Sequence, residues 1–138
     1  ETFIVRGDIP NITDEGISSL TNLRELNSER NRFTDRGISR LTHLEVLLLP
    51  ASPEITDEGI SRLPHLIQFI ANGNHSNDGI SHLTNLRILH LENGAVRISP
   101  DVIDHLPLLE KIFVRKSEMR RWKKKASPFT FNKLFDHV

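Results

Sequence analysis

The sequence predicts an α/β solenoid built from about five copies of a unit that contains one short helix and one short strand. Two observations lead to this fold class. A short segment recurs with a period of 20 to 23 residues, and each copy continues into apolar residues whose spacing shortens from three to two. A unit of that length has room for one helix and one strand, and such units must stack to bury a continuous core.

The recurring segment places a hydroxyl residue, an acidic residue, a glycine and a leucine at fixed positions. Its copies are Ile12-Thr-Asp-Glu-Gly-Ile-Ser-Ser-Leu20, Phe33-Thr-Asp-Arg-Gly-Ile-Ser-Arg-Leu41, Ile55-Thr-Asp-Glu-Gly-Ile-Ser-Arg-Leu63, the shortened Ser76-Asn-Asp-Gly-Ile-Ser-His-Leu83 and the diverged Ile98-Ser-Pro-Asp-Val-Ile-Asp-His-Leu106. Each copy runs into three apolar residues at a spacing of three: Leu20/Leu23/Leu26, Leu41/Leu44/Leu47, Leu63/Leu66/Phe69, Leu83/Leu86/Leu89 and Leu106/Leu109/Ile112.

The chain is expected to begin with a strand that no helix precedes, followed by a helix that begins after a threonine N-cap. The segment Phe3-Ile-Val5 looks like the strand half of an earlier unit, so residues 1–11 form a partial first repeat. We therefore expect that the chain was cut from a longer protein or that a partner covers this end, since solenoids need polar caps. Helices are expected to begin after the N-cap residues Thr13, Thr34 and Thr56, each followed by an aspartate that the helix dipole favours.

The remaining elements follow in the same order in each unit. The run from Ile17 to Leu23 has helical spacing, and a strand with one inward face follows it. The period of two that indicates these strands is seen in Leu47-x-Leu49, Phe69-x-Ala71, Leu89-x-Leu91 and Ile112-x-Val114.

This pattern matches the leucine-rich-repeat template L-x-x-L-x-L-x-x-N, which reads Leu23-x-x-Leu26-x-Ser28-x-x-Asn31 here. Asn74 also fits the asparagine position, whereas Ser52, Gly94 and Ser117 replace it. Over residues 3–119 the chain resembles the repeats of F-box leucine-rich-repeat proteins and related bacterial and protist proteins. The resemblance implies a right-handed β-α superhelix with a curved parallel sheet on the concave face and helices on the convex face. No F-box is visible, and one such scaffold serves many partners.

Outward-facing strand residues are the first candidate for a binding site. Aligning the copies gives two columns, Glu25, Val46, Gln68, Ile88 and Lys111, and Asn27, Leu48, Ile70, His90 and Phe113. Five of these residues are large and apolar, and an apolar patch on a solvated face is typical of a contact site. Arg115 adds charge at its rim, with Glu25, Glu29, Glu92 and Lys116. A shift of register by one residue, or a segment folded over this face, would place the columns elsewhere.

The basic C-terminal segment is the second candidate, and we assign residues 120–138 to a separate cap or tail. Although the formal net charge of the chain is zero, Arg120, Arg121, Lys123, Lys124 and Lys125 surround Trp122. One interpretation is a cap in which Met119 and Trp122 cover the last repeat. The alternatives are docking to an acidic protein, or binding of nucleic acid or an anionic membrane with Trp122 stacking on a base.

Catalysis, metals and cofactors find little support in the sequence. His43 and His65 occupy equivalent positions in adjacent repeats, as do His82 and His105, but asparagine, serine and arginine fill the same positions elsewhere. No nucleophile–base pair or phosphate-binding loop is evident. We therefore expect no enzyme activity, no metal, no cofactor and no small-molecule substrate.

The sequence thus predicts a non-catalytic protein-interaction module that binds another protein through its concave strand face. The alternative is an assembly subunit held in a larger complex through its edges or basic tail, and an electrostatic binder of nucleic acid or lipid is a third hypothesis. The chain has no cysteine, no secretory signal and no run of apolar residues long enough to span a bilayer. A cytoplasmic or otherwise intracellular location is expected.

Overall fold

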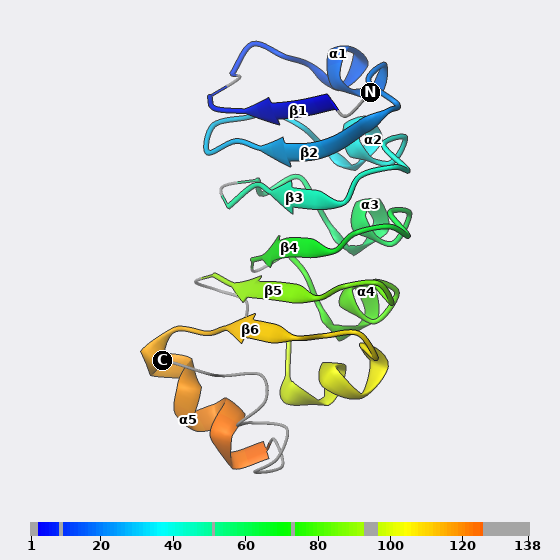
Figure 1. Cartoon of the computed structure of the whole chain (residues 1–138). Helices are drawn as coiled ribbons and strands as arrows, with labels where there is room; N and C mark the ends of the chain where they lie inside the picture. Colours follow the sequence, from blue (N-terminus) through cyan, green and yellow to red (C-terminus); the bar gives the residue numbers. More distant parts are fainter. Residues whose placement is uncertain (1–2, 9, 51, 73, 93–96, 126–138) are drawn as a thin grey trace.

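Six parallel strands form one sheet and alternate with short helices in a computed structural model that describes residues 3–8, 10–50, 52–72, 74–92 and 97–125 (Figure 1). The strands are β1 (Phe3–Arg6), β2 (Leu23–Asn27), β3 (Val46–Leu48), β4 (Gln68–Ala71), β5 (Ile88–Leu91) and β6 (Lys111–Phe113). The helices are α1 (Asp14–Ser18), α2 (Asp35–Ile38), α3 (Asp57–Ile60), α4 (Asn77–Ile80), the 3-10 helix η1 (Pro100–His105) and α5 (Lys116–Lys125).

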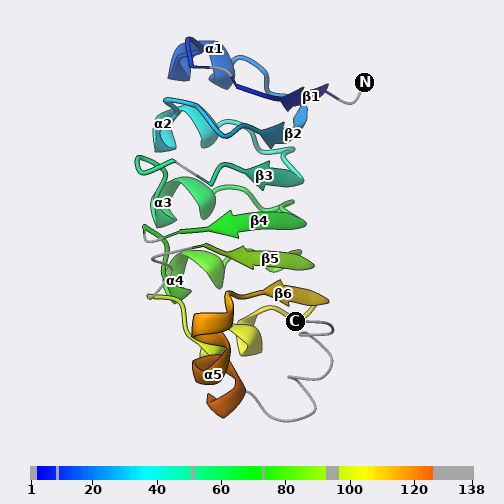
Figure 2. The ribbon, with the colours of Figure 1, turned by 90° about the vertical axis from the view of Figure 1, so that its left-hand side faces the viewer.

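The strands and helices form two layers of a solenoid-like stack. The strands follow one another across the sheet in chain order, and helices α1–α4 lie on one side of them (Figure 2). The core fills the space between these layers, because each of the strands β2–β6 turns apolar residues toward the helices. These inward residues include the buried Leu26, Leu47, Phe69, Leu89 and Ile112.

Helices α1–α4 are shorter than the apolar spacing suggests. The threonine N-caps are confirmed, since the Thr13, Thr34 and Thr56 hydroxyls accept hydrogen bonds from backbone N–H groups in the first turn. However, α1 ends at Ser18, so the expected helical run to Leu23 is wrong.

Tight turns produce the spacing of three that follows each helix. In the second unit the backbone N–H of Leu41 donates to the carbonyl of Ile38, and the N–H of Leu44 donates to the carbonyl of Leu41, each at 2.9 Å. Hydrogen bonds between residues three apart place every third side chain on one side. Equivalent pairs of bonds recur in all five units, and the leucine triplets therefore enter the core from turns.

Aspartates at the first helical position link each unit to the next. Asp35 accepts a hydrogen bond from the backbone N–H of Thr56 at 2.7 Å and a second from the Thr56 hydroxyl. We call this set of bonds the aspartate ladder. Its other steps join Asp14 to Thr34, Asp57 to Ser76 and, through an amide, Asn77 to Ser99.

The repeated glycine leaves space for this ladder. A Cβ atom on Gly59 would lie 2.2 Å from Oδ1 of Asp35, and Gly37 and Gly79 stand in the same relation to the preceding aspartate. No carbon and oxygen atom approach so closely without bonding, so a side chain here would displace the carboxylate. The motif Thr-Asp-x-Gly thus specifies contacts between units as well as helix starts.

Removing one step of the ladder tests its contribution to stability. We expect Asp35→Ala to lower the free energy of unfolding by about 2 kcal/mol, because it leaves a part-buried N–H and hydroxyl of Thr56 without their acceptor. Asp35→Asn should cost less, since Asn77 makes the equivalent pair of bonds to Ser99. Urea denaturation would measure both. The exposed Asp78→Ala provides the matched control, expected within about 0.5 kcal/mol of the native value.

The asparagine positions also join neighbouring units. Asn31 accepts a hydrogen bond from the backbone N–H of Phe33 at 3.3 Å and donates one to the Ser52 hydroxyl at 2.9 Å. Asn74 donates to the carbonyl oxygen of Pro53 at 2.7 Å. Both amides therefore bind backbone or hydroxyl groups at the turn that follows the strand.

Helix α5 covers the C-terminal end of the stack. Trp122 is 1% exposed and belongs to the core, and Met119 packs against that core. Arg121 fixes the helix further by donating to the Ile98 carbonyl oxygen at 3.0 Å. The interpretation of Trp122 as a residue that stacks on an exposed base is therefore wrong in this conformation.

The predicted boundary between residues 119 and 120 falls inside α5, and residues 126–138 of the predicted tail lie outside the described residues. Helix α5 has ten residues and is the longest helix that the structure describes. Within that part of the chain, no helix has the length and apolar character required to traverse a bilayer.

Candidate binding surface

The strand face brings the predicted binding residues together in two columns. In the first, Glu25 pairs with Val46, Val46 with Gln68, Gln68 with Ile88 and Ile88 with Lys111. In the second, Asn27 pairs with Leu48, and Ile70 with His90, which pairs with Phe113. The predicted register is therefore confirmed. Within these columns Lys111 and Phe113 are exposed, and the other eight side chains are part-exposed.

An apolar area runs across the centre of the strand face. It consists of Val46, Leu48, Ile70 and Ile88, which are part-exposed, and Phe113, which is 46% exposed. Ile4 extends the first column onto β1 and is 50% exposed. Ile4 is not among the predicted binding residues, although an alignment of Phe3-Ile-Val5 with the later strands places it beside Glu25.

Polar and aromatic contacts order the part of this face formed by β4, β5 and β6. The rings of His90 and Phe113 stack with centroids 4.7 Å apart and an interplanar angle of 9°. Nε2 of His90 lies 3.0 Å from Nε2 of Gln68. Burial lowers the pKa of His90, so the neutral ring is favoured and can accept the amide hydrogen of Gln68. The result is a flat aromatic platform held by its neighbours.

Ion pairs join neighbouring strands and the turns beside them. Arg6 binds Glu25 with two hydrogen bonds, of 2.6 and 3.1 Å. Glu92, on the predicted rim, accepts a hydrogen bond from Arg115 at 3.4 Å. Similar pairs join Arg24 to Glu45 and Arg87 to Glu110. Exposed pairs of this kind contribute little to stability, so they are available to exchange partners with an incoming surface.

The basic residues of α5 divide between two sides of the helix. Lys116, Arg120, Lys123 and Lys124 are exposed, opposite the buried Trp122. Arg121 instead binds Glu118 at 3.2 Å and the last unit's backbone. Arg121 and Trp122 therefore form the inner side of a cap, while the exposed lysines and Arg120 form a basic outer side. Lys125 ends the helix.

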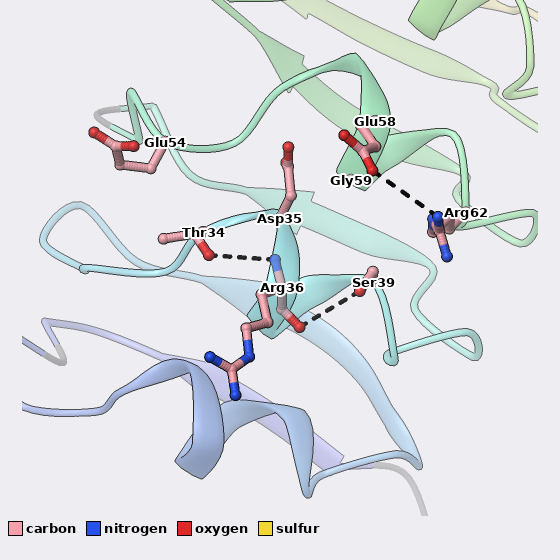
Figure 3. Close-up of a pocket in the computed structure, with 8 residues that line it drawn as sticks. All are labelled: Thr34, Asp35, Arg36, Ser39, Glu54, Glu58, Gly59 and Arg62. Carbon is pink, nitrogen blue, oxygen red and sulfur yellow. Dashed lines mark hydrogen bonds and ion pairs between the residues drawn. The ribbon is translucent and has the colours of Figure 1, made fainter.

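A shallow groove of about 500 Å³ lies on the helix side between α2 and α3 (Figure 3). Its charged lining includes Arg36, Glu58 and Arg62, with Nη2 of Arg62 4.0 Å from Oε1 of Glu58. Arg36 contacts Glu15 of the preceding helix at 3.6 Å. Thr34 and Asp35, at one end, are already bound in the aspartate ladder. The groove is therefore the space between two successive helices.

Two of the paired histidines contact backbone carbonyl groups. Nδ1 of His43 lies 3.1 Å from the Thr21 carbonyl oxygen, and Nδ1 of His82 lies 2.6 Å from that of Asp78. Within the described residues, no group of three histidine, cysteine, aspartate or glutamate side chains is arranged to hold a metal ion.

Comparison with known proteins adds no further constraint on function. The chain matches no protein-family model, and no curated protein matches it significantly. The functional argument therefore depends on the geometry of the strand face and of α5.

Proposed function

We propose that this protein is a non-catalytic leucine-rich-repeat module that binds another protein through its strand face. The observation that carries the proposal is the contiguous apolar area of β3–β6, which the sheet presents to solvent. Aliphatic residues that point outward from a solvated sheet promote aggregation unless they are covered. A protein partner that buries them accounts for their presence.

The repeat itself supports the leucine-rich-repeat assignment. Its unit of 20 to 23 residues, its L-x-x-L-x-L strand and its asparagine-bonded turns follow the template of that class. Modules of this kind use their stacked strands as an extended binding surface.

The chemistry of the strand face favours a protein over a small ligand. The apolar area extends across several strands, while charged residues such as Arg115 and Lys111 surround it, as in protein interfaces. Phe113 would serve as the anchor, because it is the most exposed large apolar side chain of β2–β6 and its ring is already held by His90. Aromatic residues fixed in this way often dominate binding energy.

We expect the triple variant Leu48→Ser, Ile70→Ser and Phe113→Ser to weaken partner binding by at least about tenfold, since truncated anchors lose buried apolar contact. The partner would be isolated by affinity capture and then purified, and its Kd would be measured by calorimetry. The array should stay folded, because these side chains are outside the core.

The matched control places three serines on the opposite side of adjacent units, at the exposed Arg40, Arg62 and His82. These changes should leave the Kd within about twofold of the native value. Equal losses for both triple variants, or no loss for the strand-face variant, would overturn the assignment of the surface.

The exposed basic side of α5 favours a second candidate function, in which the protein is an assembly subunit held through this helix. Charge reversal at Arg120 and Lys124 tests it without disturbing the buried Trp122, which deletion of the tail would remove. Binding that is lost in this variant and retained in the strand-face variant would assign the interface to α5. A steep fall of affinity with salt would further point to nucleic acid or an anionic membrane.

A further inference from the structure

The N-terminal end of the stack differs from the C-terminal end in what covers it. Helix α5 and Trp122 close the C-terminal end. At the other end β1 is the edge strand, paired with β2 alone among the strands that the structure describes. Leu20 is 37% exposed there, whereas its equivalents in the next units, Leu41, Leu63, Leu83 and Leu106, are at most 3% exposed.

The residue before each N-cap shows the same contrast. Ile12 is part-exposed, whereas Phe33, Ile55, His75 and Ile98 in the equivalent positions are at most 2% exposed. A preceding unit covers each of those four residues. The first unit therefore presents an apolar surface that has the shape of an interface between units.

The aspartate ladder is also open at this end. Thr34, Thr56 and Ser76 each donate a backbone N–H and a hydroxyl to the aspartate of the preceding helix. Ser99 donates its N–H to Oδ1 of Asn77 and accepts a hydrogen bond from the amide of that residue. No described carboxylate accepts a hydrogen bond from Thr13, whose hydroxyl accepts from the N–H of Gly16 at 3.4 Å. Within the described part of the chain, the first N-cap therefore has the donors of a ladder step without the acceptor.

Gly16 preserves the space for the missing acceptor. In the next three units a Cβ on the equivalent Gly37, Gly59 or Gly79 would lie 2.2 or 2.3 Å from an aspartate oxygen, which explains the glycine. At Gly16 a Cβ would meet Cγ2 of Ile12 at 3.2 Å and the Thr13 hydroxyl oxygen at 3.9 Å, and no carboxylate. No described carboxylate therefore accounts for the glycine at this position.

We propose that this end is a docking surface for one further β-α unit of the same kind, stacked on β1 and α1 with an aspartate at its first helical position. Its strand would pair with the free edge of β1, its core would cover Leu20 and Ile12, and its aspartate would accept from Thr13. This contact would have the same geometry as the four interfaces between successive units of the array.

A second copy of this chain does not present such a unit. Its own last unit is closed by α5, and Pro100 stands at the position of the ladder aspartate in η1. Proline offers no carboxylate to Thr13. The docking surface and the strand face are also separate, so failure of one proposal leaves the other unaffected.

The test joins a copy of residues 23–41, which carry β2 and α2, directly before Glu1 of the full chain. Phe3 then takes the position of Leu44, and the copied Asp35 faces Thr13. Amide hydrogen exchange would measure the protection of the Thr13 N–H, which should increase at least about tenfold on extension. An extension that carries Asp35→Ala in the copy is the matched control and should give little protection.

Gly16→Ala gives a second measurement whose sign depends on the extension. In the native chain the new methyl group meets Cγ2 of the part-exposed Ile12, which has room to shift, and the Thr13 hydroxyl oxygen at an ordinary contact distance. Alanine also favours the helix more than glycine does, so the melting temperature should hold or rise. In the extended chain the methyl group collides with the copied aspartate, so the melting temperature should fall. The same effect in both chains, or an unprotected Thr13 in the extended chain, would overturn the proposal. It would also be overturned if sedimentation showed that the native chain dimerises and that the extension abolishes the dimer.

Discussion

Replacing Trp122 with alanine is expected to lower the free energy of unfolding of the last unit by about 4 kcal/mol. The indole is buried between α5 and the end of the array, so its loss leaves a cavity and exposes the apolar residues beneath it. Helix α5 contacts η1, and both elements should be affected first, because each unit of a solenoid is stabilised mainly by its neighbours. Amide exchange at Ile112 and circular dichroism in urea would measure the effect.

Two further variants show whether the effect of Trp122→Ala comes from lost packing in the core. Arg120→Ala removes an exposed side chain from the same helix and should change stability by less than about 0.5 kcal/mol. Trp122→Phe should retain more of the stability than Trp122→Ala, since it keeps an aromatic ring in the core. If Trp122→Ala left stability unchanged but lowered affinity for single-stranded nucleic acid, Trp122 would be a stacking residue and the cap interpretation would be wrong.

The strand face could be predicted from the sequence because two periods fix it. The spacing of two assigns alternate residues to opposite sides of each strand, and the repeat aligns one strand with the next. These constraints were sufficient to place Gln68 beside Ile88 and His90 beside Phe113, as the sheet register has them. Ile4 was missed because its unit is incomplete, and the repeated segment that anchors the other copies does not precede it.

The aspartate ladder could not be predicted from any single unit. Asp35 follows an N-cap, which is itself sufficient reason for an acidic residue, and its hydrogen-bonding partner lies 21 residues further along the chain. The signal was present in the combination of aspartate and glycine at fixed spacing, because a helix start by itself does not require a glycine at its third position. A contact between the aspartate of one unit and the glycine of the next explains both residues.

His75 was missed for a different reason, namely an alignment that began one residue too late. The fourth copy was read from Ser76, although the residue before the N-cap is Phe33, Ile55 or Ile98 in other units. His75 fills this core position and is 1% exposed. Its ring meets that of Phe69 edge-on at 5.0 Å, and Nδ1 accepts a hydrogen bond from the backbone N–H of Asn72 at 3.1 Å. An imidazole has thus replaced an aliphatic or phenyl side chain.

The neutral form of this imidazole carries its proton on Nε2, which is buried and has no described partner. Burial lowers the pKa of His75 from 6.5 to about 4, although Asp57 and Asp35 act in the opposite direction. The folded protein therefore binds the proton more weakly than the unfolded chain does. Stability is fully present above pH 6.5 and is lost as the pH falls from 6.5 towards 4.

We expect the free energy of unfolding to fall by about 3 kcal/mol across this range because of His75. The pKa of its ring can be followed by NMR of the Cε1 proton, and urea denaturation at successive pH values would give the stability. His75→Ile, which restores the residue found at position 55, should remove most of the pH dependence between 4.5 and 6.5. At pH 7 this variant should remain within about 1 kcal/mol of the native protein, because it loses the acceptor for Asn72 but also the unpaired Nε2 proton.

The exposed His43→Asn provides the matched control, since asparagine occupies the same position at residues 22 and 85. It should preserve the pH dependence. Burial also lowers the pKa of His90, so His90 adds to the loss of stability on acidification. His90→Gln would measure this smaller contribution. If His75→Ile lost stability on acidification as steeply as the native protein, the buried imidazole would not be the source of the acid sensitivity. A single histidine in a core position would then be accommodated by the solenoid in its charged form.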